Sequence, residues 1–351
     1  MIWDPVADDL PDTGGLEYRC GRGEIRRLSS GLSFASLDDA LAVAEVEDGF
    51  CLGAGQHDVG PLTWEPGGRW GAGSSLRLVG AGAGETVLVG AISAVLHGQA
   101  NLTLDIDGSV ELEGLSFERL PLCIMAGRAQ VTDLSFISQG DSAQLFTVSS
   151  PDIEGDGIVV RDMELAGVLP VLLYGVGTVR GLEIVGNQVA PGTLLQTYLD
   201  IELIEPVITG NLAFGDELGS EGIQAYGDLS IIGGELSGNS FDGPLIHARA
   251  LLELQDVWVH ENLGLLQGTV TVDKSAVVRG GGFVGNQARS GAFSLSETSI
   301  VEFLGVDFGI GEDRNIPCDV AMMFTGDLDA QCIGLELGAG STVTCDGGGC
   351  R

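Results

Sequence analysis

Five copies of one short phrase lie between Gly181 and Asn286: Leu182-Glu-Ile-Val-Gly-Asn187, Pro206-Val-Ile-Thr-Gly-Asn211, Gly234-Glu-Leu-Ser-Gly-Asn239, Val257-Trp-Val-His-Glu-Asn262 and Gly281-Gly-Phe-Val-Gly-Asn286. Their asparagines are 24, 28, 23 and 24 residues apart. Each phrase alternates an apolar residue with another type and then breaks, usually at Gly-Asn, which is typical of a short strand ending in a left-handed turn. A repeat of this length indicates one coil of a solenoid.

The repeated asparagines are predicted to occupy left-handed turns at equivalent places in successive coils, with their amides stacked in a column. A row of ligand-binding side chains is the alternative interpretation. The members of this predicted ladder are Asn187, Asn211, Asn239, Asn262 and Asn286. If the ladder is structural, any function is to be sought at the outward-facing positions between the asparagines.

Each coil also carries two further apolar clusters, for example Leu194-Leu195 and Ile201 to Leu203. Three short strands per coil predict a three-faced solenoid, in which stacked strands lie about 4.8 Å apart around a continuous aliphatic core. One inward position is predicted to recur at Phe117, Phe136, Leu165, Ile184, Ile208, Leu236, Val259, Phe283 and Phe308. The sequence therefore predicts an all-β, single-domain parallel β-helix of roughly nine to ten coils.

The segment 36–49 differs from the rest of the chain. Ser36-Leu-Asp-Asp39 is a capping box, the alanine-rich run to Val46 has helical spacing, and Gly49 ends it. A helix followed by a strand at Phe50 and by glycine-rich text resembles the N-terminal cap of pectate-lyase-like right-handed parallel β-helix proteins. The resemblance implies a right-handed β-helix with an N-terminal capping helix that covers the open end of the first coil.

A second resemblance covers residues 180–310. Phe283-Val-Gly-Asn286 followed by Gly291-Ala292 is similar to the F-x-x-N and G-G-A repeats of chlamydial polymorphic outer-membrane proteins and related bacterial surface β-helices. It implies a secreted or surface-displayed bacterial protein. We expect a polar N-terminal extension (1–30), an N-terminal cap with the first strands (31–100), the β-helix coils (101–310) and a disulfide-rich C-terminal cap (311–351).

The chain is strongly acidic, with 50 Asp and Glu against 16 Lys and Arg and a formal charge of −34. Such a surface repels nucleic acid, anionic lipid and polyuronates, because each of them carries charge of the same sign. We therefore expect no nucleic-acid partner, and instead a neutral glycan or a surface protein. No run approaches the roughly 18 apolar residues of a membrane span, and the oligomeric state is left open.

The seven cysteines are unevenly distributed. Cys20 and Cys51 are predicted to form a disulfide that ties the N-terminal cap, and two further bridges of open connectivity are predicted among Cys318, Cys332, Cys345 and Cys350. Cys123 lies in an apolar run and is predicted to be a small buried hydrophobe. Disulfides imply an oxidising compartment, so we expect an extracellular or cell-surface protein. No signal peptide begins at Met1, so the leader is taken to have been removed.

Two acidic clusters are weak candidate calcium sites. Asp152-Ile-Glu154-Gly-Asp156 spaces three carboxylates two apart before a glycine, and Asp105 and Asp107 share the outer face of one strand. A Ca²⁺ site needs about six oxygen ligands, which neither cluster supplies alone. An acidic turn and a solvated strand edge are the competing interpretations. We expect no cofactor other than calcium at these clusters.

Carbohydrate-active proteins of the pectate-lyase-like superfamily place acids and a basic residue on an outer strand face. The corresponding candidates here, one coil apart, are Asp162, Glu164 and Glu183, with Arg161 and Arg180 nearby. None of these candidates forms the Asp-Asp, Gly-His-Gly or Arg-Ile-Lys signatures that pectin hydrolases of this fold carry.

Two histidines and one tryptophan complete the candidates. His247 and His260 are expected in the same turn region of successive coils, either as a surface pair or, more simply, as isolated side chains. Trp258 alternates outward and is a candidate for contact with a sugar or a partner, although turn packing explains it equally well. The sequence thus favours a β-helix repeat protein with a structural, adhesive or binding role and no evident catalytic site. The alternative is a polysaccharide hydrolase or lyase that uses acids on an outer face.

Overall fold

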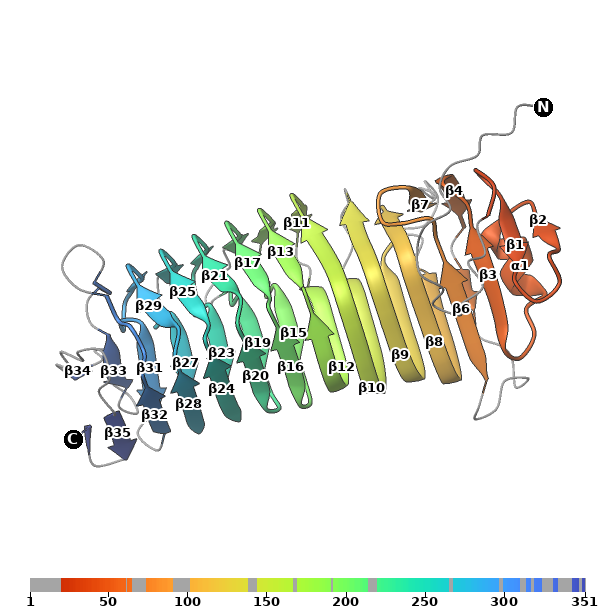
Figure 1. Cartoon of the computed structure of the whole chain (residues 1–351). Helices are drawn as coiled ribbons and strands as arrows, with labels where there is room; N and C mark the ends of the chain where they lie inside the picture. Colours follow the sequence, from red (N-terminus) through yellow and green to blue (C-terminus); the bar gives the residue numbers. More distant parts are fainter. Residues whose placement is uncertain are drawn as a thin grey trace, which may run out of the picture.

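The computed structural model describes residues 20–60, 62–64, 74–90, 102–137, 144–166, 169–190, 192–213, 220–264, 268–296, 299–309, 314–316, 319–323, 331–333, 343–346 and 349–350. Short strands stack in parallel through these residues into an elongated solenoid of about nine turns (Figure 1). The parallel β-helix expected from the repeat is therefore confirmed. Within the described ranges, no helix is long and apolar enough to cross a membrane.

Successive coils present three outer faces, called A, B and C. In the early coils single strands run across more than one face: β8 (Leu102–Glu118), β9 (Leu122–Ile137), β10 (Gln144–Arg161) and β12 (Leu169–Arg180). Face A continues with β15 (Leu195–Thr197), β19 (Ile223–Ala225), β23 (Ile246–Ala248), β27 (Val270–Val272), β31 (Phe293–Ser296) and β33 (Val320–Met323). Face B continues with β16 (Ile201–Ile204), β20 (Leu229–Ile232), β24 (Leu251–Gln255), β28 (Ser275–Arg279) and β32 (Ile300–Leu304). Face C comprises β13 (Glu183–Val185), β17 (Val207–Thr209), β21 (Glu235–Ser237), β25 (Trp258–His260) and β29 (Gly282–Val284).

A short fourth ladder follows face C, and the sequence did not predict it. It is a separate parallel sheet of two- and three-residue strands, one after each turn that ends face C. Its members are β11 (Glu164–Ala166), β14 (Gln188–Ala190), β18 (Leu212–Ala213), β22 (Ser240–Phe241), β26 (Leu263–Gly264) and β30 (Gln287–Ala288).

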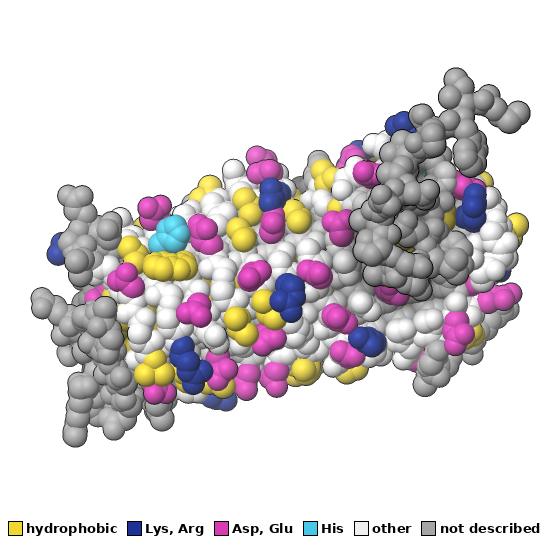
Figure 2. Space-filling view, viewed as in Figure 1, with side chains coloured by type: hydrophobic (Ala, Val, Ile, Leu, Met, Phe, Trp, Pro, Cys, Tyr) yellow, Lys and Arg dark blue, Asp and Glu magenta, His cyan; other side chains and the backbone are white. Residues whose placement is uncertain are grey.

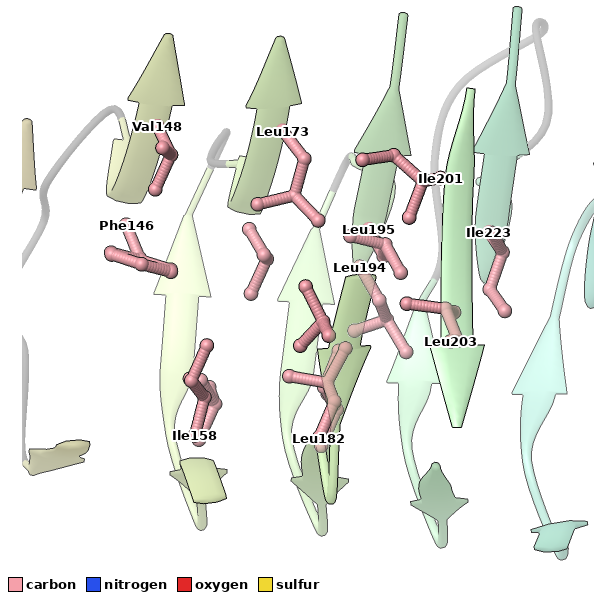
Figure 3. Packing of buried hydrophobic residues seen from close by; sticks show 14 of the residues in the cluster. Phe146, Val148, Ile158, Leu173, Leu182, Leu194, Leu195, Ile201, Leu203 and Ile223 are labelled. Atoms are coloured by element: carbon pink, nitrogen blue, oxygen red, sulfur yellow. The ribbon is translucent and has the colours of Figure 1, made fainter. Parts of the chain in front are cut away.

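Alternation of side chains explains both the strands and the core. In β16, Ile201 and Leu203 are buried, whereas Glu202 between them points outward. Figure 3 shows Leu195, Ile201, Leu203 and their neighbours from successive coils packed together inside the solenoid. Each fully buried aliphatic side chain of this kind stabilises the fold by about 1.5 to 3 kcal/mol. The core is one continuous cluster along the described coils.

The predicted inward column is wrong at one position. Strand register places Phe136 opposite Val160, and Val160 opposite Ile184. Leu165 instead lies in β11 of the fourth ladder, opposite Val189. With Val160 in the column, the irregular spacings of 29 and 19 residues between Phe136 and Ile184 both become 24, so these two coils keep the period of the later ones.

The N-terminal end of the solenoid carries an antiparallel hairpin and the helix (Figure 1). α1 (Leu37–Ala42) begins at the N-cap Ser36, whose hydroxyl accepts a hydrogen bond from the Asp39 backbone N–H, and it ends earlier than the predicted Val46. Its expected role as a cap over the first coil stays a prediction. The strands of this region are β1 (Ile25–Arg27), β2 (Ser33–Phe34), β3 (Asp48–Leu52), β4 (Gly55–Val59), β5 (Leu62–Trp64), β6 (Ser75–Val79) and β7 (Thr86–Gly90).

Two of the cysteine predictions have a structural outcome. Cys20 and Cys51 form a disulfide bond that ties the chain before β1 to β3. The prediction that Cys123 is a small buried hydrophobe is wrong. Its side chain points outward from β9, between the buried Leu122 and Ile124, and is half-buried. Burial, followed by the nearby charge of Asp105, raises the pKa of its thiol.

The C-terminal region pairs in antiparallel fashion against the last coils. Its strands are β34 (Gln331–Ile333), β35 (Val343–Asp346) and β36 (Gly349–Cys350). β34 lies beside β33, and β35 pairs with both β32 and β36, so that Cys345 stands opposite Cys350. Cys318 lies outside the described residues. The two bridges predicted among Cys318, Cys332, Cys345 and Cys350 stay predictions.

Candidate functional site

The repeated asparagines form a buried column of hydrogen bonds. Asn187 donates from both its backbone N–H and its side-chain Nδ2 to Oδ1 of Asn211, at 2.9 Å each. Its Nδ2 also donates to the backbone carbonyl of Val160 at 3.0 Å. The same pattern recurs at each following member, Asn211, Asn239, Asn262 and Asn286. Because these amides bond within the protein, they offer no row of free groups to a ligand.

The left-handed turn lies one residue earlier than predicted. The positive backbone φ belongs to the residue before each asparagine, for example Gly186 at 67° and Gly238 at 60°. Glycine adopts this conformation without a Cβ penalty. In the Asn262 coil a non-glycine residue, Glu261, takes it at 55°. The asparagines themselves are absent from the described residues with positive φ.

Two of the acids proposed from sequence as catalytic, Asp162 and Glu164, line one hollow, and the third, Glu183, pairs with an arginine of that hollow. Glu183 pairs with Arg161, whereas Asp162 takes up a left-handed turn conformation with a φ of 53°. Arg161, Asp162 and Glu164 line a hollow of about 610 Å³ at the end of β10, and all three are exposed to solvent.

The candidate calcium ligands lie on strands. Asp152 and Glu154 point outward from β10, where Arg128 of the preceding coil pairs with both, at 3.4 and 2.9 Å. Asp156 lies further along the same strand. Asp105 and Asp107 lie on the outer side of β8. Among the described residues no three acidic, histidine or cysteine side chains gather into a metal-binding group.

Face A carries a column of aromatic rings that the sequence reasoning missed. Tyr174, Tyr198 and Tyr226 occupy equivalent places in three successive coils, with ring centroids 5.2 and 4.8 Å apart. The guanidinium of Arg249, in the next coil, lies 4.4 Å from the centre of the Tyr226 ring. Tyr174 and Tyr198 are 50% and 37% exposed, so the column forms part of the outer surface.

A second column of polar side chains runs beside the tyrosines. Strand register places Gln196, Gln224 and His247 in line on the outer side of β15, β19 and β23. The side-chain amide of Gln196 donates to Oε1 of Gln224, and also reaches the hydroxyl of Tyr226 at 3.4 Å. The column is neutral until His247.

His247 lies between two carboxylates. Its Nδ1 is 2.8 Å from Oε1 of Glu221, and its Nε2 is 3.4 Å from Oδ2 of Asp273. Glu221 is only 8% exposed, and its second oxygen, Oε2, is buried and accepts no hydrogen bond from the described residues. Glu221 precedes β19 and packs close to Gly243, where an added Cβ would come within 3.3 Å of the Glu221 Cγ.

The two carboxylates shift the proton affinity of the imidazole. Burial by itself lowers the pKa of His247, and the positive charge of Arg249 acts in the same direction. The hydrogen bond and charge of Glu221, together with the charge of Asp273, outweigh these effects and leave the pKa of His247 raised. The folded protein therefore holds the imidazolium proton more tightly than a free histidine does, and in the imidazolium form Nε2–H is directed toward Asp273.

The predicted neighbourhood of the two histidines is wrong. His247 belongs to β23 on face A, whereas His260 belongs to β25 on face C, where its Nε2 lies 3.2 Å from Oε1 of Glu235. Each histidine thus pairs with a glutamate and not with the other histidine. The two residues lie in different strands of the coil, which places them on different outer faces.

No family model and no curated protein matches the chain. Among solved structures, it is similar to the A-module of mannuronan C-5 epimerase AlgE6 of Azotobacter vinelandii, with 16% identity, a TM-score of 0.47 and 74% of each chain covered. It is also similar to the A-module of mannuronan C-5 epimerase AlgE4 of the same organism, with 14% identity, a TM-score of 0.40, and 83% of this chain and 94% of that one covered. These values are too low to bear on the chemistry of the site. By its own strand pairing, the chain is a parallel β-helix of the kind expected from its resemblance to the pectate-lyase-like superfamily.

Proposed function

We propose that the chain is a carbohydrate-active protein that binds a neutral glycan along face A and cleaves it with His247 as proton donor. The observation that carries this proposal is the buried Glu221 carboxylate, which holds Nδ1 of His247 while its own Oε2 has no partner among the described residues. The pair lies on an outer face beside Arg249 and Asp273.

The fold does not need this charged pair. The preceding coils fill the same column with Gln196 and Gln224, which satisfy each other without charge. Removing a carboxylate from water costs several kcal/mol, and a buried ion pair returns little net stability. A carboxylate kept at 8% exposure with an unpaired oxygen is therefore better explained by a chemical role than by stability.

The shape of face A suits a linear polar polymer. Tyrosine hydroxyls, glutamine amides and the Arg249 guanidinium recur at the coil spacing of about 4.8 Å, which is close to the length of one sugar unit. The stacked tyrosine rings face one another, so their edges and hydroxyls, rather than their faces, are available to a ligand. Hydrogen bonding to sugar hydroxyls is thus the main contact expected here.

The proposed chemistry is hydrolysis. The imidazolium of His247 gives its Nε2 proton to the glycosidic oxygen as the carbon–oxygen bond breaks, and a water molecule bonds to the anomeric carbon and releases its proton to solvent. His247 then regains a proton from solvent. The raised pKa increases the fraction of His247 that carries this proton, compared with an unperturbed histidine at the same pH. In glycosidases the two catalytic groups that flank the scissile bond are usually at least about 5 Å apart. Asp273 lies only 3.4 Å from His247, so it is too close to act as the second catalytic group.

The competing function is adhesion. A rigid rod with an acidic surface also suits a surface protein that holds a glycan without changing it, and the Tyr174–Tyr198–Tyr226 column alone would serve that role. The two functions differ in turnover. Binding without any cleavage would favour the adhesive protein.

The experiment is incubation of the protein with neutral β-glucan, galactomannan, xylan and starch, and with acidic alginate and polygalacturonate, each with Ca²⁺ or with a chelator. We expect new reducing ends from at least one neutral polysaccharide and none from the acidic ones. H247Q and E221Q should lower the rate by at least about 100-fold, the usual contribution of a general acid. Unsaturated products, or no cleavage of any polysaccharide, would overturn the proposal.

The matched control uses the other acids. D162N and E164Q alter exposed carboxylates beside the hollow at the end of β10. Both variants should keep wild-type activity. If they abolish cleavage while H247Q does not, the chemistry belongs to that hollow and not to face A.

We also propose that the protein works outside the cytosol. The Cys20–Cys51 disulfide supports an oxidising compartment. Fractionation of the native host, with the bond checked by thiol labelling of the freshly isolated protein, tests this location.

A further inference from the structure

Trp258 is an exposed aromatic residue on face C, far around the coil from His247. It points outward from β25 and is 48% exposed. Strand register aligns Trp258 with Glu235 of the preceding coil and with Gly282 of the next coil. Asp307 pairs with Gly282 and so occupies the following place in this outward-facing column. Figure 2 shows hydrophobic and histidine side chains together over this end of the solenoid, with acidic side chains around them.

The indole lies over the neighbouring strand. A Cβ added to Gly282 would come within 2.6 Å of Cζ3 and 3.0 Å of Cε3 of Trp258. The six-membered ring therefore takes the space that a side chain at position 282 would occupy. The Cζ3 and Cε3 atoms of the ring thus lie against Gly282 of β29, while 48% of the side chain is exposed to solvent. Gly282 has no positive φ, so the need for glycine here is steric and not conformational.

Polar groups are fixed on one side of this ring. His260 Nε2 lies 3.2 Å from Oε1 of Glu235, and the Ser237 hydroxyl donates to the same oxygen at 2.7 Å. Two contacts on Oε1 hold the carboxylate in place and leave Oε2 to accept from a ligand. Asp307 stands at the other end of the column, where its Oδ1 accepts the Gly309 backbone N–H.

The spacing fits a sugar. Glu235 and Asp307 are three coils apart, which corresponds to roughly 14 Å at the strand spacing of a sheet. Between them lie only the flat indole and a glycine. An apolar ring face bounded by hydrogen-bond acceptors matches a pyranose ring, whose C–H face packs on an aromatic ring while its hydroxyls donate outward. The two carboxylates disfavour an acidic sugar at this position.

We propose that Trp258, Gly282, Glu235 and Asp307 form a second carbohydrate site, a platform for a neutral pyranose unit that is separate from the His247 site. A cationic peptide is the other ligand that acidic groups around an indole could attract. A cation over an exposed ring gains only about 0.5 to 1 kcal/mol, and one flat ring does not enclose it. The neutral sugar therefore fits the geometry better.

The test is titration of the full chain with cellohexaose, mannohexaose and maltohexaose, followed by tryptophan fluorescence and by calorimetry. We expect saturable binding of at least one hexasaccharide, with a fluorescence change that is absent in W258A. G282A keeps the tryptophan but displaces its ring, so its affinity should fall at least tenfold in calorimetry. L263A, which removes a 40% exposed apolar side chain from the neighbouring ladder, should bind like the wild type.

Two further measurements separate this site from the face A proposal. H247Q should lose cleavage and keep the hexasaccharide-dependent fluorescence change. Thermal unfolding of W258A and G282A should match the wild type within a few degrees, which excludes a folding defect. The platform is overturned if no hexasaccharide binds, if W258A binds as tightly as the wild type, or if only a salt-sensitive interaction with oligolysine depends on Trp258.

Discussion

Asn286 donates from both its backbone N–H and its side-chain Nδ2 to one atom, Oδ1 of Asn315, at 3.1 and 3.0 Å. The asparagine column thus continues one coil further than the five repeated phrases indicate. Asn315 is 2% exposed, and its Nδ2 donates to the carboxylate of Asp319 at 2.9 Å. At the N-terminal end of the column, Met163 occupies the place before Asn187. It donates only its backbone N–H to Oδ1 of Asn187.

The column should be a main contributor to stability. In N239A the carbonyl of Ile208 and two donors of Asn211 lose their partner in the interior. Each buried group left without a hydrogen bond costs about 1 to 3 kcal/mol, so we expect a loss of about 3 to 5 kcal/mol. Chemical denaturation followed by circular dichroism measures it. S240A, which changes a half-buried serine beside the column, serves as the control. Equal stability of N239A and S240A would contradict the role given to the column.

The turn before Asn262 should tolerate glycine better than its native residue. Glu261 has a φ of 55° where the other coils have Gly186, Gly210, Gly238 and Gly285. A left-handed backbone costs an L-residue about 1 to 2 kcal/mol, and the extra flexibility of glycine in the unfolded chain offsets part of this. We expect E261G to raise the melting temperature by a few degrees, and E261A to leave it nearly unchanged. A lower melting temperature for E261G would mean that the Glu261 side chain makes a compensating contact.

The stability contributed by His247 should depend on pH. Its pKa is raised in the folded protein above the ordinary value of about 6.5. Its contribution is therefore fully present below about pH 6.5 and is lost as the pH rises through the folded pKa. The difference in melting temperature between wild type and H247Q should be largest near pH 6 and shrink toward pH 9. A difference that grows with pH would reverse the assigned direction of the shift.

The Cys20–Cys51 bond should stabilise the N-terminal end. It closes a loop with a sequence separation of 31, for which the chain-entropy model gives about 3 to 4 kcal/mol. We expect C20A/C51A to lower the melting temperature of the wild type and to reduce its response to reducing agent. C123A should respond to reduction like the wild type, because Cys123 is a free thiol. If C20A/C51A still responded to reduction, another disulfide would be responsible.

The sequence was sufficient for the repeating elements of the fold. The Gly-Asn phrase carries its own period, and alternation within it identifies the inward residues, so coils with a clear turn were aligned correctly. The alignment failed at Leu165, because β10 runs without a break across three faces and offers no turn from which to count. Asn315 was missed for a related reason: it lies 29 residues after Asn286, outside any recognisable phrase.

The candidate site could be predicted only in part from the sequence. Tyr174, Tyr198 and Tyr226 are 24 and 28 residues apart, the same intervals as between Asn187, Asn211 and Asn239. A search for any residue type that repeats at the intervals between the asparagines would have found this column. The contact between Glu221 and His247 has no such signal, because it joins a turn in one coil to a strand in the next and depends on side-chain direction.

The asparagine column also has a direction. Every side-chain carbonyl faces the preceding coil, toward the N-terminal end, so the C=O dipoles add along the axis, as peptide dipoles do in an α-helix. Each Nδ2 donates in both directions, to the next asparagine and to a backbone carbonyl of the preceding coil. Asp319 places a carboxylate at the positive pole of this array. An inserted coil that supplies one asparagine would lengthen the array anywhere along its course, whereas a coil added at the end must first displace Asp319. Among the described residues, Asp319 is therefore the acceptor at which the column ends.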